Sequence, residues 1–298
     1  PWTILTDLGW FTPYRLTVPG FAASWTALAW GLFVLSMAVK RAAPWRYALP
    51  LRAVAHVLLP FALLWGIADA ETSRVTCGLV ALYYGLAAWL DYRDARAVPL
   101  RARVTRWLYP ALGLIPVWCV YVMAWYVPKA PHQLYGLMLL PFGPLGLLAG
   151  HWLRRKLRIT NDEANLQSSV PGPQSFVYGL PAYLTGYVAV IVGTMLVAHV
   201  AGLLSLVLLY DALLLLVSAR IFRDPLWLYP AALLAPISLL IALDQAGVPG
   251  NRHGWWLMGL ATLYFALTWL LRRVKLDIYS TAPLAVGFVL LAVGLPPS

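Results

Sequence analysis

Two related segments carry the first signal of architecture: WLYPALGLIP at residues 107–116 and WLYPAALLAP at residues 227–236. In each, Trp and Tyr precede a proline, and a second proline follows six residues after the first. Trp and Tyr favour the level of the lipid headgroups, and proline is tolerated in the first turn of a helix, where its missing N–H costs nothing. The segments therefore predict the starts of two membrane-spanning helices. The second proline predicts a kink that leaves backbone carbonyls for a neighbouring helix to accommodate.

The composition agrees with a membrane location. Apolar residues make up 61% of the 298 residues and charged residues 11%, against roughly 45–50% and about 25% in soluble domains. So few charged side chains cannot cover the surface of a soluble chain of this length. The excess of basic over acidic residues, 22 against 11, would suggest nucleic acid only on a folded soluble domain, and no such domain fits here.

Windows of about 20 apolar residues, long enough to cross the hydrocarbon core, predict ten spans. The sixth and seventh are separated only by a corner around Gly202, which leaves nine helices as an alternative. The predicted spans are 21–38, 53–69, 75–90, 107–127, 133–152, 177–200, 203–219, 226–244, 254–271 and 279–296.

The basic residues predict the orientation of the spans. Loops that follow odd-numbered spans hold 18 of the 22 basic residues, and the opposite face keeps only Arg15, Arg74, Lys129 and Arg252. By the positive-inside rule, the odd-to-even loops face the cytoplasm and both termini face outward. The chain opens on Pro1 without a signal sequence, so we expect a processed chain or part of a longer one.

An internal repeat relates the spans in pairs. Trp30, Tyr83, Tyr210 and Tyr264 each precede a basic loop by nine or ten residues, and 53 residues separate Trp30 from Tyr83. A proline follows each loop. The pattern predicts an all-α polytopic membrane protein made as one transmembrane domain over 1–298, with five parallel helical hairpins. Two spans per copy argue against an inverted-repeat transporter and favour duplication of a packing unit. The hairpins are 21–69, 75–127, 133–200, 203–244 and 254–296.

Serial hairpins with Tyr in the first helix, a basic loop and Tyr-Pro-Ala opening the second resemble a family of large polytopic membrane proteins of actinobacteria and chloroflexi. In those proteins, similar hairpins recur many times. The resemblance implies a bacterial inner-membrane location, and it brings no catalytic residues to this chain.

Asp211, in LLYDALLLL, is the only acidic residue well inside a predicted span. Burying a carboxylate there costs at least ~2.5 kcal/mol, so the residue is a candidate proton or substrate site. The alternative is a protonated or hydrogen-bonded acid that ties two helices together. The other hairpins carry Gly31, Tyr84 and Phe265 at the matching position. The packing unit therefore does not require an acid.

Two histidines are further candidates. His56 lies inside the second span at a depth similar to that of Asp211, and the two form a candidate intramembrane polar site if helices two and seven are neighbours. His56 and His199 are also candidate axial ligands for a chlorin or haem, since neutral imidazole is a common one. The alternative for each is a hydrogen bond to a neighbouring helix or the headgroups. We predict no metal site, the cofactor stays open with a chlorin or haem as the candidates, and the spans contain no lysine for a retinal Schiff base.

Other acidic residues lie outside the predicted spans. Asp69 and Glu71 have the spacing of a metal-binding pair but are interpreted as a solvated loop. Asp91 and Asp94 are flanked by arginines and are interpreted as part of a charge-balanced cytoplasmic loop. We identify no catalytic constellation.

Two segments favour contacts with other molecules or helices. Gly146 and Gly150 in the fifth span have GxxxG spacing, which predicts a face for close helix packing. The stretch 154–176 is too polar to bury. It predicts a cytoplasmic loop where a soluble partner docks.

The leading hypothesis is a non-enzymatic structural or accessory subunit of a larger membrane assembly, with the lipid bilayer and other membrane subunits as partners and no nucleic acid. The first alternative is a transporter of a lipid or small apolar solute, with Asp211 coupling protons. The second is a pigment- or haem-carrying subunit that binds its cofactor through His56 or His199.

Overall fold

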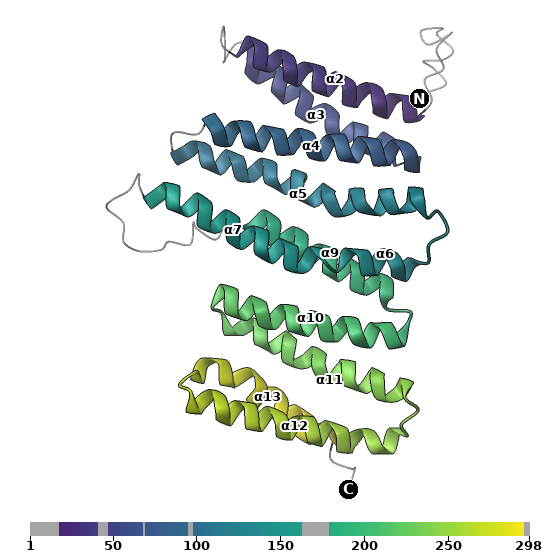
Figure 1. The fold of residues 1–298 in the computed structure, drawn as a ribbon, viewed down its shortest axis with the longest axis vertical. Coiled ribbons are helices and arrows are strands. Elements are labelled where there is room, and N and C mark those ends of the chain that lie inside the picture. Colours follow the sequence, from purple (N-terminus) through teal and green to yellow (C-terminus); the bar gives the residue numbers. More distant parts are fainter. Residues whose placement is uncertain (1–17, 41–46, 68, 95–97, 163–178, 295–298) are drawn as a thin grey trace. The chain divides into compact units, whose positions relative to one another are not determined.

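The structure is a computed structural model that describes residues 18–40, 47–67, 69–94, 98–162 and 179–294. Within these ranges the backbone forms helices and no strand (Figure 1). The helices are α2 (Val18–Val39), α3 (Leu49–Gly66), α4 (Ala70–Asp94), α5 (Val98–Tyr126), α6 (His132–Leu139), α7 (Phe142–Asp162), α9 (Leu180–Val197), α10 (Ala201–Phe222), the short 3-10 helix η2 (Pro225–Trp227), α11 (Leu228–Gln245), α12 (Gly250–Arg273) and α13 (Asp277–Gly294).

Ten helical segments in the described residues are long and apolar enough to cross a membrane, which confirms the predicted number. The fifth span, His132–Arg155, joins α6 to the first part of α7 across a break at Leu140 and Pro141. The sixth and seventh spans are separate helices. The corner between them lies at residues 198–200, where Val200 is extended (φ −112°, ψ 92°), and Gly202 belongs to α10.

The chain divides into two compact units. The first unit comprises Pro1–Ala130 and Arg154–Thr185, and the second comprises Pro131–Leu153 and Gly186–Ser298. The boundary passes through α7 and α9. A single domain over 1–298 stays a prediction.

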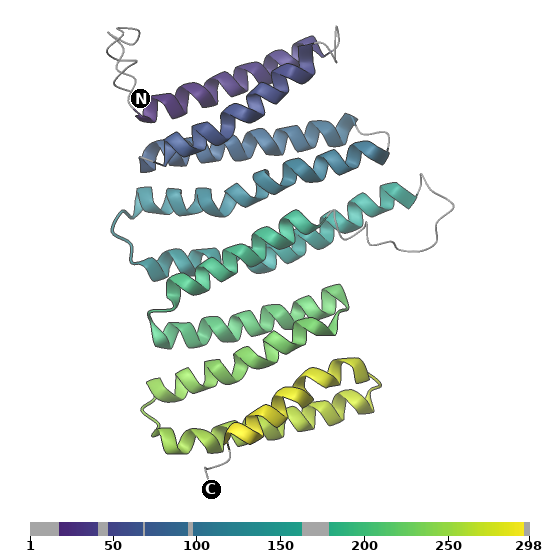
Figure 2. The same cartoon turned by 180° about the vertical axis from the view of Figure 1, so that it is seen from behind.

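In the first unit, α2 packs against α3 and α4 against α5, and both α2 and α3 contact α4. The C-terminal ends of α2 and α4 lie at the same end of this unit, next to the starts of α3 and α5 (Figures 1 and 2). Small side chains on α2 and α3 leave room for aromatic rings of α4 in the core. The buried cluster consists of Ala29, Phe33, Ala55, Leu59, Val80, Tyr83, Tyr84, Ala87, Leu90 and Ala111.

In the second unit, α10 packs against α11 and α12 against α13, and α11 contacts both helices of the last pair. The C-terminal ends of α10 and α12 lie at one end, which we call the basic end of this unit (Figure 2). It carries Arg220, Arg223, Arg272, Arg273 and Lys275.

Helix α7 extends further than the sequence predicted. It continues to Asp162, into the stretch expected to be a polar loop from residue 154. Arg and Lys are good helix formers, so leaving the apolar part of a span does not by itself end a helix. Residues 163–176 of that stretch lie outside the described residues.

Helix α4 begins earlier than predicted because Asp69 caps it. The backbone N–H and the hydroxyl of Thr72 donate to Asp69 Oδ2 at 2.8 and 2.7 Å, which satisfies an N–H that has no partner within the helix. Glu71 lies in the first turn, where a negative charge interacts favourably with the helix dipole. Asp69 therefore lies outside the helix, in agreement with the predicted loop, whereas Glu71 is exposed but belongs to α4 and not to a loop.

This cap predicts a pH-dependent stability. The hydrogen bonds from Thr72 lower the pKa of Asp69 below its ordinary value. A carboxyl with a lowered pKa in the folded protein stabilises the fold above its unfolded pKa of about 3.9, and this contribution disappears as the pH falls through the folded pKa. Thermal unfolding between about pH 6 and 3 should therefore show a larger acid-induced loss for the wild type than for Asp69→Asn, because an amide keeps the cap without titrating.

Asp277→Asn is the matched control for the cap. Asp277 also lies in the first turn of a helix, and within the described part of the chain its carboxylate accepts no recorded hydrogen bond. For Asp277→Asn, the loss of thermal stability between pH 6 and pH 3 should be closer to the wild-type loss than it is for Asp69→Asn. Equal pH profiles for wild type and Asp69→Asn would contradict the prediction.

Candidate functional site

Asp211 lies in the middle of α10 in the second unit and is 9% exposed. Thr194 Oγ1 on α9 is 2.8 Å from Asp211 Oδ2 and 3.0 Å from the carbonyl oxygen of Val190. A hydroxyl has one proton, so it cannot donate a full hydrogen bond to both oxygens. With an ionised Asp211 the Thr194 hydroxyl shares its one proton between the two oxygens, whereas with a protonated Asp211 both contacts become full hydrogen bonds, because Asp211 donates to Thr194 and Thr194 donates to Val190 O. The geometry therefore fits a neutral carboxyl that links α9 to α10.

The second oxygen of this carboxyl, Asp211 Oδ1, also fits a neutral acid. Asp211 Oδ1 is buried and has no hydrogen-bond partner within the described residues. An unpaired charged oxygen in a membrane span would be costly, whereas a carbonyl oxygen of a neutral acid costs less. The carboxyl of Asp211 thus has one oxygen paired with Thr194 and one oxygen without a partner among the described residues, in the middle of a span.

His56, on α3 of the first unit, is half-buried among aromatic rings. Its ring stacks on Trp107 at a centroid distance of 4.1 Å and meets Tyr83 edge-on at 5.3 Å. Its Nδ1 is buried and unpartnered among the described residues. His56 and Asp211 belong to different units, so each is surrounded by groups of its own unit, and the hypothesis that they pair stays untested.

An ion pair at the edge of this cluster was missed by the sequence interpretation. Arg52 Nη1 lies 3.7 Å from Asp91 Oδ1, with the two side chains 22% and 18% exposed. The indole of Trp107 donates to Asp91 Oδ2 at 2.8 Å, and Arg52 Nε donates to Ser36 Oγ at 3.2 Å. Asp91 therefore lies in a helix and in an ion pair, and not in the charge-balanced loop that was predicted. The sequence interpretation counted the charges of each loop and treated every charged side chain as exposed. Such a count cannot predict an ion pair between two helices.

Two further polar atoms of the aromatic cluster have no partner in the described part of the chain: Trp30 Nε1 and Tyr83 Oη. Trp30 and Tyr83 meet edge-on at 5.6 Å, and Phe33 lies 4.6 Å from Tyr83. Buried polar atoms are normally hydrogen-bonded, so three exceptions in one cluster, with His56, single it out as a place where polar atoms remain available.

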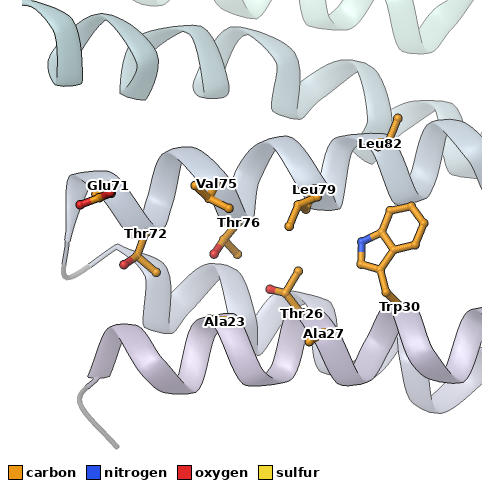
Figure 3. Close-up of a pocket in the computed structure, with 10 residues that line it drawn as sticks. All are labelled: Ala23, Thr26, Ala27, Trp30, Glu71, Thr72, Val75, Thr76, Leu79 and Leu82. Atoms are coloured by element: carbon orange, nitrogen blue, oxygen red, sulfur yellow. The ribbon is translucent and has the colours of Figure 1, made fainter.

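A groove of about 590 Å³ lies between α2 and α4 beside this cluster (Figure 3). Trp30 and Leu82 line one end, and Glu71 and Thr72 line the other. Thr26 and Thr76 lie on opposite sides between them (Figure 3). The hydroxyl of Thr26 donates to Ala22 O at 2.7 Å on its own helix. The groove wall is therefore mainly apolar.

His199 lies in the corner between α9 and α10 and is exposed. Its Nε2 is 3.3 Å from Gln133 Oε1, so it contacts a polar side chain at the end of a span. His56, in contrast, is enclosed by rings. Among the described residues, no group of three or more His, Cys, Asp or Glu side chains is placed to hold a metal ion. Chlorin or haem binding stays a prediction.

Tyrosine hydroxyls in the second unit reach carbonyls next to prolines. Tyr264 on α12 donates to Ala232 O on α11 at 2.8 Å, and Ala232 is four residues before Pro236. Proline has no N–H, so it leaves the carbonyl four residues earlier without its helical partner. Sequence reasoning had predicted such free carbonyls but not the group that satisfies them.

The same arrangement occurs at the break between α6 and α7. Tyr210 on α10 donates to Leu140 O at 2.7 Å, and Leu140 is four residues before Pro144. This carbonyl also accepts the N–H of Gly143 at 3.0 Å. Tyr210 and Tyr264 are two of the four aromatic residues that mark the repeat in the sequence. Each hydrogen bond connects a helix to an earlier hairpin.

Glycines bring α6 and α7 close to α9 within the second unit. A Cβ on Gly136 would lie 2.6 Å from Gly193 O, and one on Gly193 would lie 2.8 Å from Gly136 O. A Cβ on Gly186 would lie 3.2 Å from the Cα of Gly146. Gly150, the other glycine of the predicted packing face, is buried. The close approach thus involves several glycines that the GxxxG pattern did not indicate.

The ten long apolar helices define an α-helical multi-pass membrane protein. No protein-family model matches its sequence, and no curated protein or solved structure matches it. The function is therefore argued from geometry.

Proposed function

We propose that this protein is a non-enzymatic structural or accessory subunit of a larger membrane protein assembly. One observation carries the proposal: the hydroxyls of Tyr210 and Tyr264 donate to backbone carbonyls beside prolines of an earlier hairpin. Hydrogen bonds of this kind connect membrane helices. These two tyrosine hydroxyls thus hold helices together, as expected for a packing role.

The proposal includes an internal repeat of five parallel hairpins. Tyr210 and Tyr264 occupy matching positions in the sequence, and each donates to a carbonyl four residues before a proline of the preceding hairpin. The carbonyl that Tyr210 contacts lies in the first span of its hairpin, however, whereas the carbonyl that Tyr264 contacts lies in the second helix of its own. Tyr83 and Trp30 stand at the same position but have buried, unpartnered polar atoms among the described residues. The hairpins of the first unit therefore have an aromatic ring at the repeat position but not the hydrogen bond to a carbonyl of an earlier hairpin.

The proposed orientation places the basic ends of the hairpins in the cytoplasm and both termini outside, in the inner membrane of a bacterium. The asymmetry of basic residues supports this orientation. The stretch 154–176 is then on the cytoplasmic side, as a docking site for a partner.

The surface of the spans supports an assembly role. Among the ten spans in the described residues, the buried share of the apolar window reaches at most 44%. Large rings such as Trp255 and Trp269 are 74% and 62% exposed. Lipid covers such surfaces in a monomer, and other subunits cover part of them in a complex.

Isolation from native membranes in a mild detergent tests the proposal. We expect the full chain to migrate as a complex, with other membrane subunits recovered in constant ratio by mass spectrometry. An absorption spectrum of the same fraction tests for a pigment or haem. Recovery only as a free monomer that moves a solute in liposomes would refute the subunit role.

The second candidate is a transporter of a lipid or small apolar solute in which Asp211 couples protons. The hydrogen-bond geometry that fits a neutral carboxyl favours it, because a proton-coupling acid must bind a proton within the membrane. Asp211→Asn distinguishes the two functions, since an amide donates to Thr194 but cannot exchange a proton.

For a structural Asp211, Asp211→Asn should lower the free energy of unfolding by less than Asp211→Leu does, because the amide keeps a hydrogen bond to Thr194. Asp211→Leu should cost roughly 0.6–1.7 kcal/mol, as for hydrogen bonds between membrane helices. Unfolding titrations in mixed micelles measure both. Thr194→Val is the matched partner variant, and combining it with Asp211→Leu should add little. Loss of proton-driven solute flux in Asp211→Asn, at unchanged stability, would support the transporter instead.

A further inference from the structure

A second groove, of about 760 Å³, lies in the second unit among α10, α11, α12 and α13. Its walls are formed mainly by leucine and alanine side chains, including Leu213, Ala235 and Leu267. Among the described residues that line it, Arg220 alone carries a formal charge. The groove therefore offers an apolar body and one positive charge.

The groove has the depth of one lipid leaflet. Its lining residues on α10 run from Leu209 to Arg220, a rise of about 16 Å at 1.5 Å per residue. The hydrocarbon core of a bilayer is about 30 Å thick, so this is roughly half. On α11 and α13 the lining residues lie near the helix starts, and on α12 they lie toward its end. These positions lie mainly in the half of the unit that is nearer to its basic end.

The groove wall offers few free hydrogen-bonding groups to a polar ligand. The hydroxyl of Tyr264, which lines the groove, already donates to Ala232 O at 2.8 Å. Apart from Arg220 and the hydroxyl of Tyr279, which lies near the start of α13, the groove contacts an occupant through mainly apolar surface. A saturated or unsaturated acyl chain fits such a wall, whereas a hydrophilic solute would lose its hydration without compensation.

Arg220 distinguishes the class of lipid. Its side chain is exposed, and within the described residues no hydrogen bond or ion pair is recorded for it. The two acidic residues nearest to Arg220 in the chain have other partners: Asp224 accepts the N–H of Leu226 at 3.0 Å, and Asp211 contacts Thr194 at 2.8 Å. The guanidinium is therefore available to a phosphate, which it binds with suitable geometry.

We propose that this groove binds an anionic phospholipid of the leaflet at the basic end, with its phosphate at Arg220 and an acyl chain along Leu213 and Leu267. The lipid lies between the hairpin α10/α11 and the hairpin α12/α13 and contacts both. Basic pockets between membrane helices are a common site for anionic headgroups. This inference is independent of whether the protein is a subunit or a transporter.

Native mass spectrometry of the full chain tests the site, with phosphatidylglycerol and phosphatidylcholine of equal chain length added in turn. We expect wild-type protein to retain phosphatidylglycerol preferentially. Arg220→Gln should weaken its retention about fivefold, the effect of removing one cation that contacts a lipid headgroup. Inorganic phosphate alone should not displace the lipid, because the acyl chain contributes most of the contact.

Two variants separate the site from general effects. Arg273→Gln is the matched control, since Arg273 lies at the same end but its guanidinium is placed over the ring of Trp269, at 5.2 Å from the ring centre. It should leave retention close to wild type. Ala235→Trp should fill the groove and lower retention of both lipids while the protein still elutes as a single folded species. Equal retention in wild type and Arg220→Gln, equal binding of the two lipids, or displacement by free phosphate would each overturn the proposal.

Discussion

Replacing Gly136 with alanine should lower the free energy of unfolding by about 1–3 kcal/mol, the range for overpacking a tightly packed site. The new Cβ would lie 2.6 Å from Gly193 O and 2.7 Å from Val197 Cγ2. A backbone oxygen cannot move aside as a flexible side chain can. The two helices must therefore separate, and the reciprocal contact between Gly136 and Gly193 is lost. Unfolding titrations in mixed detergent micelles measure the loss.

Gly259→Ala is the control for this prediction. Gly259 also lies inside a helix, α12, but a Cβ there would meet no atom within 4 Å. Alanine has the higher helix propensity by about 1 kcal/mol, so this change should be neutral or stabilising. The same gain in propensity opposes the loss at Gly136. If Gly136→Ala proved as stable as Gly259→Ala, the close packing of α6 on α9 would be wrong.

Replacing Tyr264 with phenylalanine should cost roughly 0.6–1.7 kcal/mol, because it leaves the carbonyl of Ala232 without a donor. The size of this cost should depend on Pro236. In a Pro236→Ala background, the introduced alanine supplies the N–H that proline lacks, and Ala232 O regains its helical partner. Tyr264→Phe should then cost less, by about 0.5 kcal/mol or more, as a double-mutant cycle measures.

Tyr229→Phe tests the specificity of that coupling. The hydroxyl of Tyr229 donates to Thr281 Oγ1 at 3.2 Å and not to a backbone carbonyl. Tyr229→Phe should therefore change the free energy of unfolding by the same amount in the wild type and in the Pro236→Ala background. Equal costs of Tyr264→Phe in the two backgrounds would show that the hydroxyl does not compensate for the proline.

The number of spans was predictable because hydropathy is a local property. Each span needs only enough consecutive apolar residues, and all ten predicted segments correspond to helices. Their ends were less predictable, since a cap depends on one hydrogen bond. Because Asp69 caps α4, this helix begins at Ala70, before the predicted span. Helix α7 continues to Asp162, beyond its apolar part.

The candidate site was predicted only in part. Asp211 was identified from the sequence, because an acid inside an apolar window is rare. Its partner Thr194 was not, since threonine is common in such helices and lies 17 residues away. The pairing of Arg52 with Asp91 was missed for a similar reason. Neither residue is unusual at the end of a span, and only packing brings the two charges together.

Composition, apolar windows and prolines were therefore sufficient to establish a helical multi-pass membrane protein and to locate the helices along the chain. These signals are properties of one segment and its solvent. Which carbonyl Tyr264 satisfies, which glycines allow α6 to approach α9, and which groove Arg220 borders were decided by tertiary packing. They depend on the distance between atoms far apart in sequence, and hydropathy contains no information about that distance.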